Sequence, residues 1–131
     1  MTKRILFVDD DADWRLIVKD CLEDAGFEVV TVTDATQAMV EADGLKLDLI
    51  IVDLDLGGEN GFGLMKILKL NYPDVRFLLY TGLLHREVAA QAIPYGNAPP
   101  YLRKGTMEEL LQGVWDVLRD KSAVQECHAL Q

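Results

Sequence analysis

The sequence predicts a doubly wound α/β protein, in which a parallel β-sheet is covered by helices on both faces. Short apolar runs rich in β-forming residues alternate with longer amphipathic stretches, which is typical of repeated βα units. Five such units can be counted from Arg4 onward. The apolar runs contain few polar residues, as expected for strands that are buried on both sides.

The five strands are expected where these runs occur. Their residues are 5–8, 28–32, 49–53, 77–80 and 101–103.

The first two helices are predicted from apolar spacing and from their ends. Apolar side chains recur at helical spacing from Trp14 to Ala25, and Gly26 follows as a stop signal. Asp34 and Gln37 have the spacing of a capping box at the start of a second helix.

Three further helices complete the five units. The third is expected at about residues 64–71, and a short fourth at about 86–93 is ended by Pro94. Thr106 and Glu109 form a capping box for the last helix, which carries an apolar stripe. We therefore expect residues 1–121 to form one domain and residues 122–131, where the pattern dissolves, to be a flexible C-terminal tail.

Length and charge restrict the classes of function. The 131 residues suffice for one ordinary domain. A net charge of −9 disfavours direct binding to nucleic acid or to anionic lipid. No apolar run is long enough to span a membrane or to form a signal peptide, so we expect a cytoplasmic protein. Cys21 and Cys127 are expected to be free thiols because they form no metal-binding pattern.

Polar residues follow four of the predicted strands at the point where each strand ends. In open α/β sheets, ligands bind beyond the carboxyl ends of the strands. The residues that meet at this edge are Asp9, Asp10, Asp53, Thr81 and Lys104.

This set of side chains favours phosphoryl chemistry with a metal ion. Three carboxylates repel one another unless a cation compensates them, and hard oxygen ligands suit Mg²⁺. Asp53 is the candidate nucleophile, since a carboxylate can accept a phosphoryl group as an acyl phosphate. Thr81 can donate a hydrogen bond, and Lys104 can place positive charge beside the phosphoryl oxygens.

Four motifs resemble those of response-regulator receiver domains. They are VDD at 8–10, VDLDLGGENG at 52–61, YTG at 80–82 and YLRKG at 101–105. The resemblance covers roughly residues 3–120 and implies a flavodoxin-like fold with five helices and strand order 2-1-3-4-5. It also implies a signalling module that takes a phosphoryl group from a histidine kinase or phosphotransfer protein and acts on an output protein whose identity is open. Apart from self-phosphorylation and slow autodephosphorylation, no enzymatic activity is expected.

The resemblance implies a role for each matching residue. Asp53 matches the phosphoacceptor, Asp10 a direct metal ligand and Asp9 a carboxylate that holds the metal through water. The backbone carbonyl of Asp55 matches a further metal ligand.

The remaining matches concern the phosphoryl group and the response to it. Thr81 and Lys104 match the pair that contacts phosphate, and Thr81 and Tyr101 match the switch residues. Two glycines depart from the family pattern, because Gly57 and Gly105 stand where proline is usual. Gly57 predicts a more mobile loop after Asp53, and Gly105 leaves the placement of Lys104 open.

Other readings of the same residues are possible. Asp53 and Asp55 also look like the nucleophile and acid of haloacid-dehalogenase-like phosphatases, although that motif normally follows the first strand. A flavin binder of the same topology is disfavoured by the acidic loop after the first strand. A receiver that only docks partners would fail to accept phosphate.

Overall fold

The computed structural model describes residues 2–56, 59–83, 85–92 and 100–119 of the chain. Gly57, Pro94, Cys127 and the predicted tail at 122–131 lie outside these residues, so the expectations about them stay predictions.

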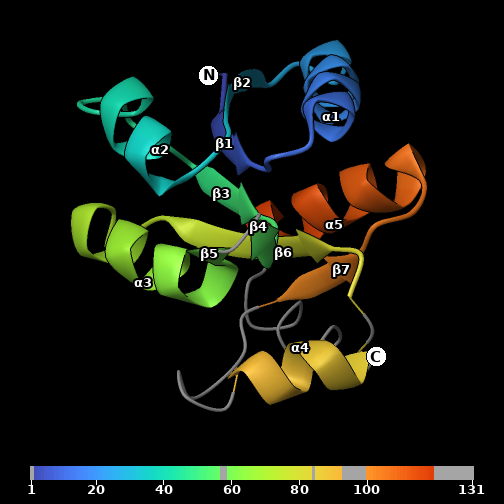
Figure 1. Cartoon of the computed structure of the whole chain (residues 1–131). Helices are drawn as coiled ribbons and strands as arrows, with labels where there is room; N and C mark the ends of the chain where they lie inside the picture. Colours follow the sequence, from blue (N-terminus) through green and yellow to red (C-terminus); the bar gives the residue numbers. More distant parts are fainter. Residues whose placement is uncertain (1, 57–58, 84, 93–99, 120–131) are drawn as a thin grey trace.

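The predicted parallel sheet is present with the predicted topology (Figure 1). All its pairings are parallel, and the spatial order of the strands is β2-β1-β3-β6-β7, which is the expected order 2-1-3-4-5. The strands are β1 (Arg4–Val8), β2 (Glu28–Val32), β3 (Leu49–Val52), β6 (Arg76–Thr81) and β7 (Tyr101–Arg103).

Three strands have bounds that differ from the prediction, since β1 and β6 each begin one residue earlier, at Arg4 and Arg76. The third strand ends at Val52, so Asp53 lies just beyond it, and β6 extends to Thr81. A short antiparallel pair was not predicted: β4 (Asp55–Leu56) pairs with β5 (Glu59–Asn60). Two-residue strands contain too few positions to show an alternating pattern, which explains why the sequence did not predict them.

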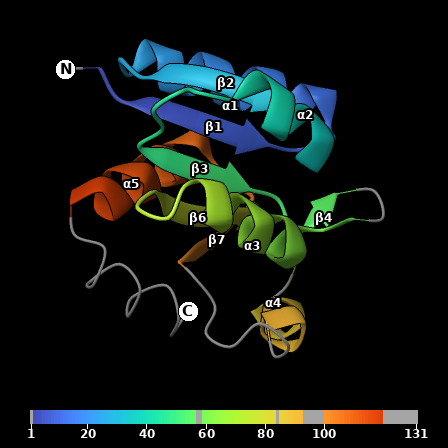
Figure 2. The same cartoon turned by 90° about the vertical axis from the view of Figure 1, so that its left-hand side faces the viewer.

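Within the described residues, four helices lie between strands of the sheet and a fifth follows β7, which gives the five helices predicted. They are α1 (Ala12–Asp24), α2 (Ala35–Glu41), α3 (Gly61–Asn71), α4 (His85–Ala92) and α5 (Met107–Arg119). α1 and α5 cover one face of the sheet, whereas α2 and α3 cover the other (Figure 1). Figure 2 shows α2 and α3 in front of the sheet and α4 beyond its β7 edge.

The predicted helix caps are confirmed. The Asp34 carboxylate accepts the backbone N–H of Gln37 at 2.8 Å, and the Thr106 hydroxyl accepts that of Glu109 at 3.1 Å. Asp11 caps α1 by accepting the N–H groups of Asp13 and Trp14. These bonds satisfy donors that have no partner inside the helix and so fix where each helix begins.

Alternate residues of each central strand point to opposite faces and form two separate hydrophobic clusters. Leu6 and Val8 belong to the cluster beneath α2, α3 and α4, whereas Ile5 and Phe7 belong to the one beneath α1 and α5. Burial of both faces explains why the strands read as continuous apolar runs. Within the described residues, no helix is both long and apolar enough to cross a membrane.

Gly61 fixes the start of α3 against the chain that leaves β3. A side chain at this position would lie 2.7 Å from the Cα atom of Leu54 and would also meet the backbone oxygen of Asp53. Backbone atoms cannot rotate away from such a contact. Gly61 therefore allows α3 to pack directly against the segment that carries Asp53.

We expect Gly61→Ala to lower the free energy of unfolding by about 1–3 kcal/mol, the usual cost of overpacking. Gly113→Ala is the matched control, because the methyl group there meets the end of the Leu102 side chain, which can rotate. Urea denaturation of both variants measures the difference. Equal stability of the two alanine variants would contradict this account of Gly61.

Candidate functional site

Backbone hydrogen bonds of the sheet continue past the strand ends and hold the predicted site residues. The Asp9 N–H donates to the Val32 oxygen at 3.1 Å, and the Asp53 N–H donates to the Val8 oxygen at 3.0 Å. On the other side, the Lys104 N–H donates to the Thr81 oxygen at 2.7 Å. Asp9, Asp53 and Lys104 therefore share the rigidity of the sheet, although each lies one residue beyond the end of its strand.

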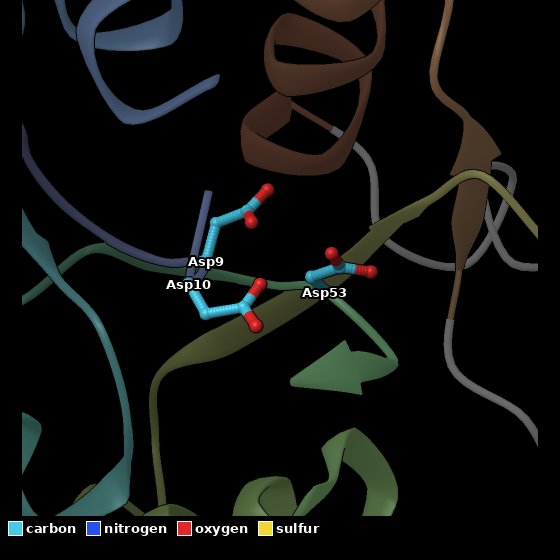
Figure 3. A group of neighbouring side chains, drawn as sticks. All are labelled: Asp9, Asp10 and Asp53. Carbon is cyan, nitrogen blue, oxygen red and sulfur yellow. The ribbon is translucent and has the colours of Figure 1, made fainter. Parts of the chain in front are cut away.

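Three carboxylates gather at this edge, as the sequence predicts. Asp9, Asp10 and Asp53 each place one oxygen within 4.8 Å of the others, and Figure 3 shows the three side chains clustered beside the ends of β1 and β3. Asp9 and Asp53 are buried, whereas Asp10 is exposed. Several carboxylate oxygens with one open side form a donor set that suits Mg²⁺, which keeps water ligands. The residues present thus fit the expected cofactor.

Lys104 supplies positive charge between the two buried carboxylates. Its Nζ lies 2.6 Å from Asp9 Oδ2 and 3.0 Å from Asp53 Oδ2. Burial alone would lower the pKa of Lys104, but its hydrogen bonds to Asp9 and Asp53 and the charges of both outweigh burial and raise the pKa. The ammonium is therefore protonated at neutral pH and holds both carboxylates.

The second oxygen of Asp9 is held by the backbone. Asp9 Oδ1 accepts the N–H of Asp11 at 2.9 Å. The two oxygens of this fully buried carboxylate thus have different partners, one from the chain and one from Lys104. This arrangement orients Asp9 towards the site.

Thr81 lies beside the acidic group at the end of β6. The residue is fully buried, and its Oγ1 accepts the N–H of Leu83 at 3.2 Å. Thr81 also lines a cavity of about 410 Å³ together with Asp9, Asp10, Asp53 and Lys104. Its hydroxyl is thus at the site, as the sequence predicts.

Tyr101 is already inside the protein in this structure. It is only 7% exposed and belongs to the cluster that contains Leu79 and Val88. The resemblance implies that Tyr101 is a switch residue, one that reorients when the site is phosphorylated. The structure describes the inward position, so its role as a switch stays a prediction.

The expectations for Asp55 and Gly105 have different outcomes. Asp55 lies in β4, opposite Asn60, and its proposed role as a carbonyl ligand stays a prediction. Gly105 does not prevent Lys104 from reaching the two carboxylates. All peptide bonds of the described residues are trans, and the bond between Lys104 and Gly105 is one of them.

Two aromatic residues at the site were not predicted to act on Lys104. Its Nζ lies 4.9 Å from the centroid of the Trp14 ring, and Tyr80 packs edge-on against Trp14. Trp14 could have been noticed, because it lies in the first turn of α1 just after the acidic loop. Tyr80 reads as an ordinary strand residue, and the sequence has no signal for its contact with Trp14.

Comparison with known proteins identifies the family. The family model of the response regulator receiver domain matches residues 5–114. The chain belongs to this family. Receiver domains are signalling modules, and the family assignment agrees with the acidic group at Asp9, Asp10 and Asp53.

Several relatives of this receiver domain are known. The alginate biosynthesis transcriptional regulatory protein AlgB of Pseudomonas putida is 32% identical over 115 residues, which cover 82% of this chain and 26% of AlgB. The chain therefore spans about a quarter of the length of that curated relative.

Among solved structures, the chemotaxis protein CheY4 of Vibrio cholerae is similar, with a TM-score of 0.81 and 30% identity over 90% of this chain and 100% of that one. The response regulator TrrA of Thermotoga maritima, solved in complex with Mg²⁺-BeF, has a TM-score of 0.75 and 26% identity over 89% of this chain and 100% of that one.

We expect Lys104→Met to destabilise the metal-free receiver by about 3–5 kcal/mol, because Asp9 and Asp53 lose the cation between them. Added Mg²⁺ should restore more stability to this variant than to the wild type, since the metal supplies the missing charge. Lys19→Met is the control, because Lys19 forms only an exposed 3.9 Å pair with Glu23. Thermal denaturation with and without Mg²⁺ measures the loss of stability and its recovery. An equal gain in stability from Mg²⁺ in the wild type and in Lys104→Met would contradict the statement about the metal.

The same ion pairs predict a pH dependence. Because the pKa of Lys104 is raised by folding, its contribution is fully present below the ordinary lysine value of about 10.4 and is lost as pH rises through the higher folded-state value. The stability difference between wild type and Lys104→Met should therefore stay constant from neutral pH to that point and narrow above it. A difference that shrinks already near neutral pH would show that another group is responsible.

Proposed function

We propose that this receiver domain accepts a phosphoryl group on Asp53 and passes the signal to a partner protein by a change of conformation. The observation that carries the proposal is the position of Asp53, whose carboxylate pairs with Lys104 and has an oxygen within 4.8 Å of oxygens of Asp9 and Asp10. The complex of TrrA with Mg²⁺-BeF supports it, because beryllofluoride mimics a phosphoryl group.

The chemical step is a transfer of the phosphoryl group between two nucleophiles. An oxygen of Asp53 forms a bond to phosphorus while the bond from phosphorus to the donor atom breaks, and the donor keeps that electron pair. Mg²⁺ held by Asp9, Asp10, Asp53 and the Asp55 carbonyl would offset negative charge on the phosphoryl oxygens. Lys104 offers its ammonium to a further phosphoryl oxygen.

The partners follow from the chemistry and from the family. The donor is a sensor histidine kinase or a phosphotransfer protein, and the receiver unit spans residues 1–121. The negative net charge favours a protein as the output partner over nucleic acid or a membrane. Such a kinase signals in the cytoplasm, and we place this protein there.

The alternative, a phosphatase of the haloacid-dehalogenase type that uses Asp53 and Asp55, is disfavoured, because the chain belongs to the receiver family and Asp53 follows the third strand and not the first. A receiver reacts once per molecule, whereas a phosphatase releases many product molecules. Sustained turnover of p-nitrophenyl phosphate that is lost in Asp55→Asn would favour the phosphatase.

We expect acetyl phosphate with Mg²⁺ to add one phosphoryl group to the wild type and none to Asp53→Asn. Removal of the metal with EDTA should also prevent labelling, because the charge of the phosphoryl group is then uncompensated. Asp74→Asn is the control, since Asp74 is exposed and lies at the opposite end of the sheet. Intact-mass spectrometry measures the label, and full labelling of Asp53→Asn would exclude Asp53 as the acceptor.

We expect Thr81→Ala to retain phosphorylation on Asp53 while weakening the conformational response. The Thr81 hydroxyl would bind a phosphoryl oxygen, and β6 and β7 would transmit that change to Tyr101 because Leu79 and Tyr101 are paired. Amide NMR with beryllofluoride should show smaller shift changes across α4, β7 and α5 in Thr81→Ala and Tyr101→Ala than in the wild type. Wild-type shifts in both variants would refute this switch.

A further inference from the structure

Lys104 is held by an aromatic ring as well as by carboxylates. Its Nζ lies 4.9 Å from the centroid of Trp14, within the range of a cation–π interaction. The backbone of Trp14 is fixed at the start of α1, because its backbone N–H donates to the capping carboxylate of Asp11 at 3.2 Å. The indole and the acidic loop thus come from the same turn of chain.

Tyr80 connects this ring to the backbone next to Lys104. Its side chain is fully buried and packs edge-on against Trp14, with the ring centroids 5.7 Å apart and the planes at 85°. At the other end of the side chain, the Tyr80 hydroxyl accepts the N–H of Gly105 at 3.3 Å. Tyr80 therefore contacts Trp14, whose ring lies beside the Lys104 ammonium, and Gly105, which follows Lys104 in the chain.

The contact with Gly105 depends on a departure from the family pattern. Proline, the residue usual at this position, has no N–H and could not donate to Tyr80. Glycine can donate, but its backbone is freer than that of proline, so it restrains Lys104 less. The hydrogen bond from Gly105 to the Tyr80 hydroxyl restrains the backbone of this glycine.

Phosphorylation makes such a support useful. Once an oxygen of Asp53 is bonded to phosphorus, the aspartate itself no longer carries the charge that paired with Lys104. The attraction between the ammonium and the Trp14 ring does not depend on the chemical state of Asp53. The contact between Lys104 and Trp14 can therefore persist when Asp53 is phosphorylated.

We propose that Trp14 and Tyr80 are positioning residues for Lys104, and that together they replace the restraint that proline gives in other receivers. Trp14 holds the ammonium, and Tyr80 holds both the Trp14 ring and the backbone of Gly105. This inference rests on the proposed phosphorylation of Asp53 and adds the residues that place its cation.

The first test compares the rates at which variants are labelled by acetyl phosphate at saturating Mg²⁺. Trp14→Leu keeps apolar volume but has no ring, so its rate should fall roughly 2- to 30-fold, which corresponds to the loss of a cation–π contact. Trp14→Phe should retain most of the rate, because it keeps a ring. Trp115→Leu is the control, since Trp115 packs on Phe27 away from the site. Calorimetric titration sets a saturating Mg²⁺ concentration for each variant, because Lys104 pairs with Asp9 and Asp53, which would hold the metal.

The second test is a rescue. Tyr80→Phe keeps the ring and removes only the hydroxyl, so it should fold and label more slowly than the wild type. Adding Gly105→Pro to Tyr80→Phe should restore the rate, because proline supplies the restraint and leaves no hydroxyl without its donor. Gly105→Pro alone should destabilise the protein, since the buried Tyr80 hydroxyl then loses its hydrogen bond.

The outcomes separate this inference from the proposed function. A wild type that takes no label refutes the proposed function itself. Wild-type rates in Trp14→Leu and Tyr80→Phe, with a wild type that is labelled, overturn the positioning role and leave phosphorylation intact. If Trp14→Leu does not fold, Tyr80→Phe decides, because it changes a single oxygen atom. A double variant that labels no faster than Tyr80→Phe overturns the claim that these residues replace proline.

Discussion

The structure of the site depends on one constraint, which is that two buried carboxylates share a single ammonium. Asp9 is fully buried, and burial of an unpaired carboxylate would cost several kcal/mol. Lys104 removes most of that cost, and its own burial is offset by the same two contacts. In this structure, each charge compensates for the burial of the other. The acidic group and the lysine are therefore one unit, although 95 residues separate Asp9 from Lys104.

The sheet brings this unit together because its strands are parallel. β1, β3, β6 and β7 end at the same edge, and backbone hydrogen bonds extend the order to Asp9, Asp53 and Lys104. Site residues on free loops would need further contacts to hold such distances, since ordering a residue costs conformational entropy. Here the entropy of ordering these residues is lost when the sheet folds, so no further contacts are needed. The loops beyond the strands need only place Asp10 and the residues that follow Asp53.

Most of the fold and of the charged site could be predicted from the sequence, because both follow from local patterns. Apolar runs and capping residues mark the elements, and the edge of a parallel sheet collects whatever follows its strands. The pair β4 and β5 is too short for such a pattern. The contacts of Trp14 and Tyr80 with the Lys104 region could not be predicted either, because they depend on how α1 and β6 pack in space. The sequence predicts a strand that includes Asp53, because this residue directly continues an apolar run. Only the hydrogen-bonding pattern of the structure sets the end of the strand at Val52.

The division of the core by the sheet has a consequence for how this protein can diverge. Trp14 and Tyr80 pack in the cluster under α1 and α5, whereas Tyr101 and Val88 pack in the cluster on the opposite side. The two clusters are separated by the backbone of the strands, and effects of substitutions without shared neighbours are nearly additive. Under the proposed role of Trp14, changes around it would therefore alter the rate of phosphorylation without altering the conformational response that a partner detects. Under the proposed switch, changes around Tyr101 would alter the conformational response that a partner detects without altering the rate of phosphorylation.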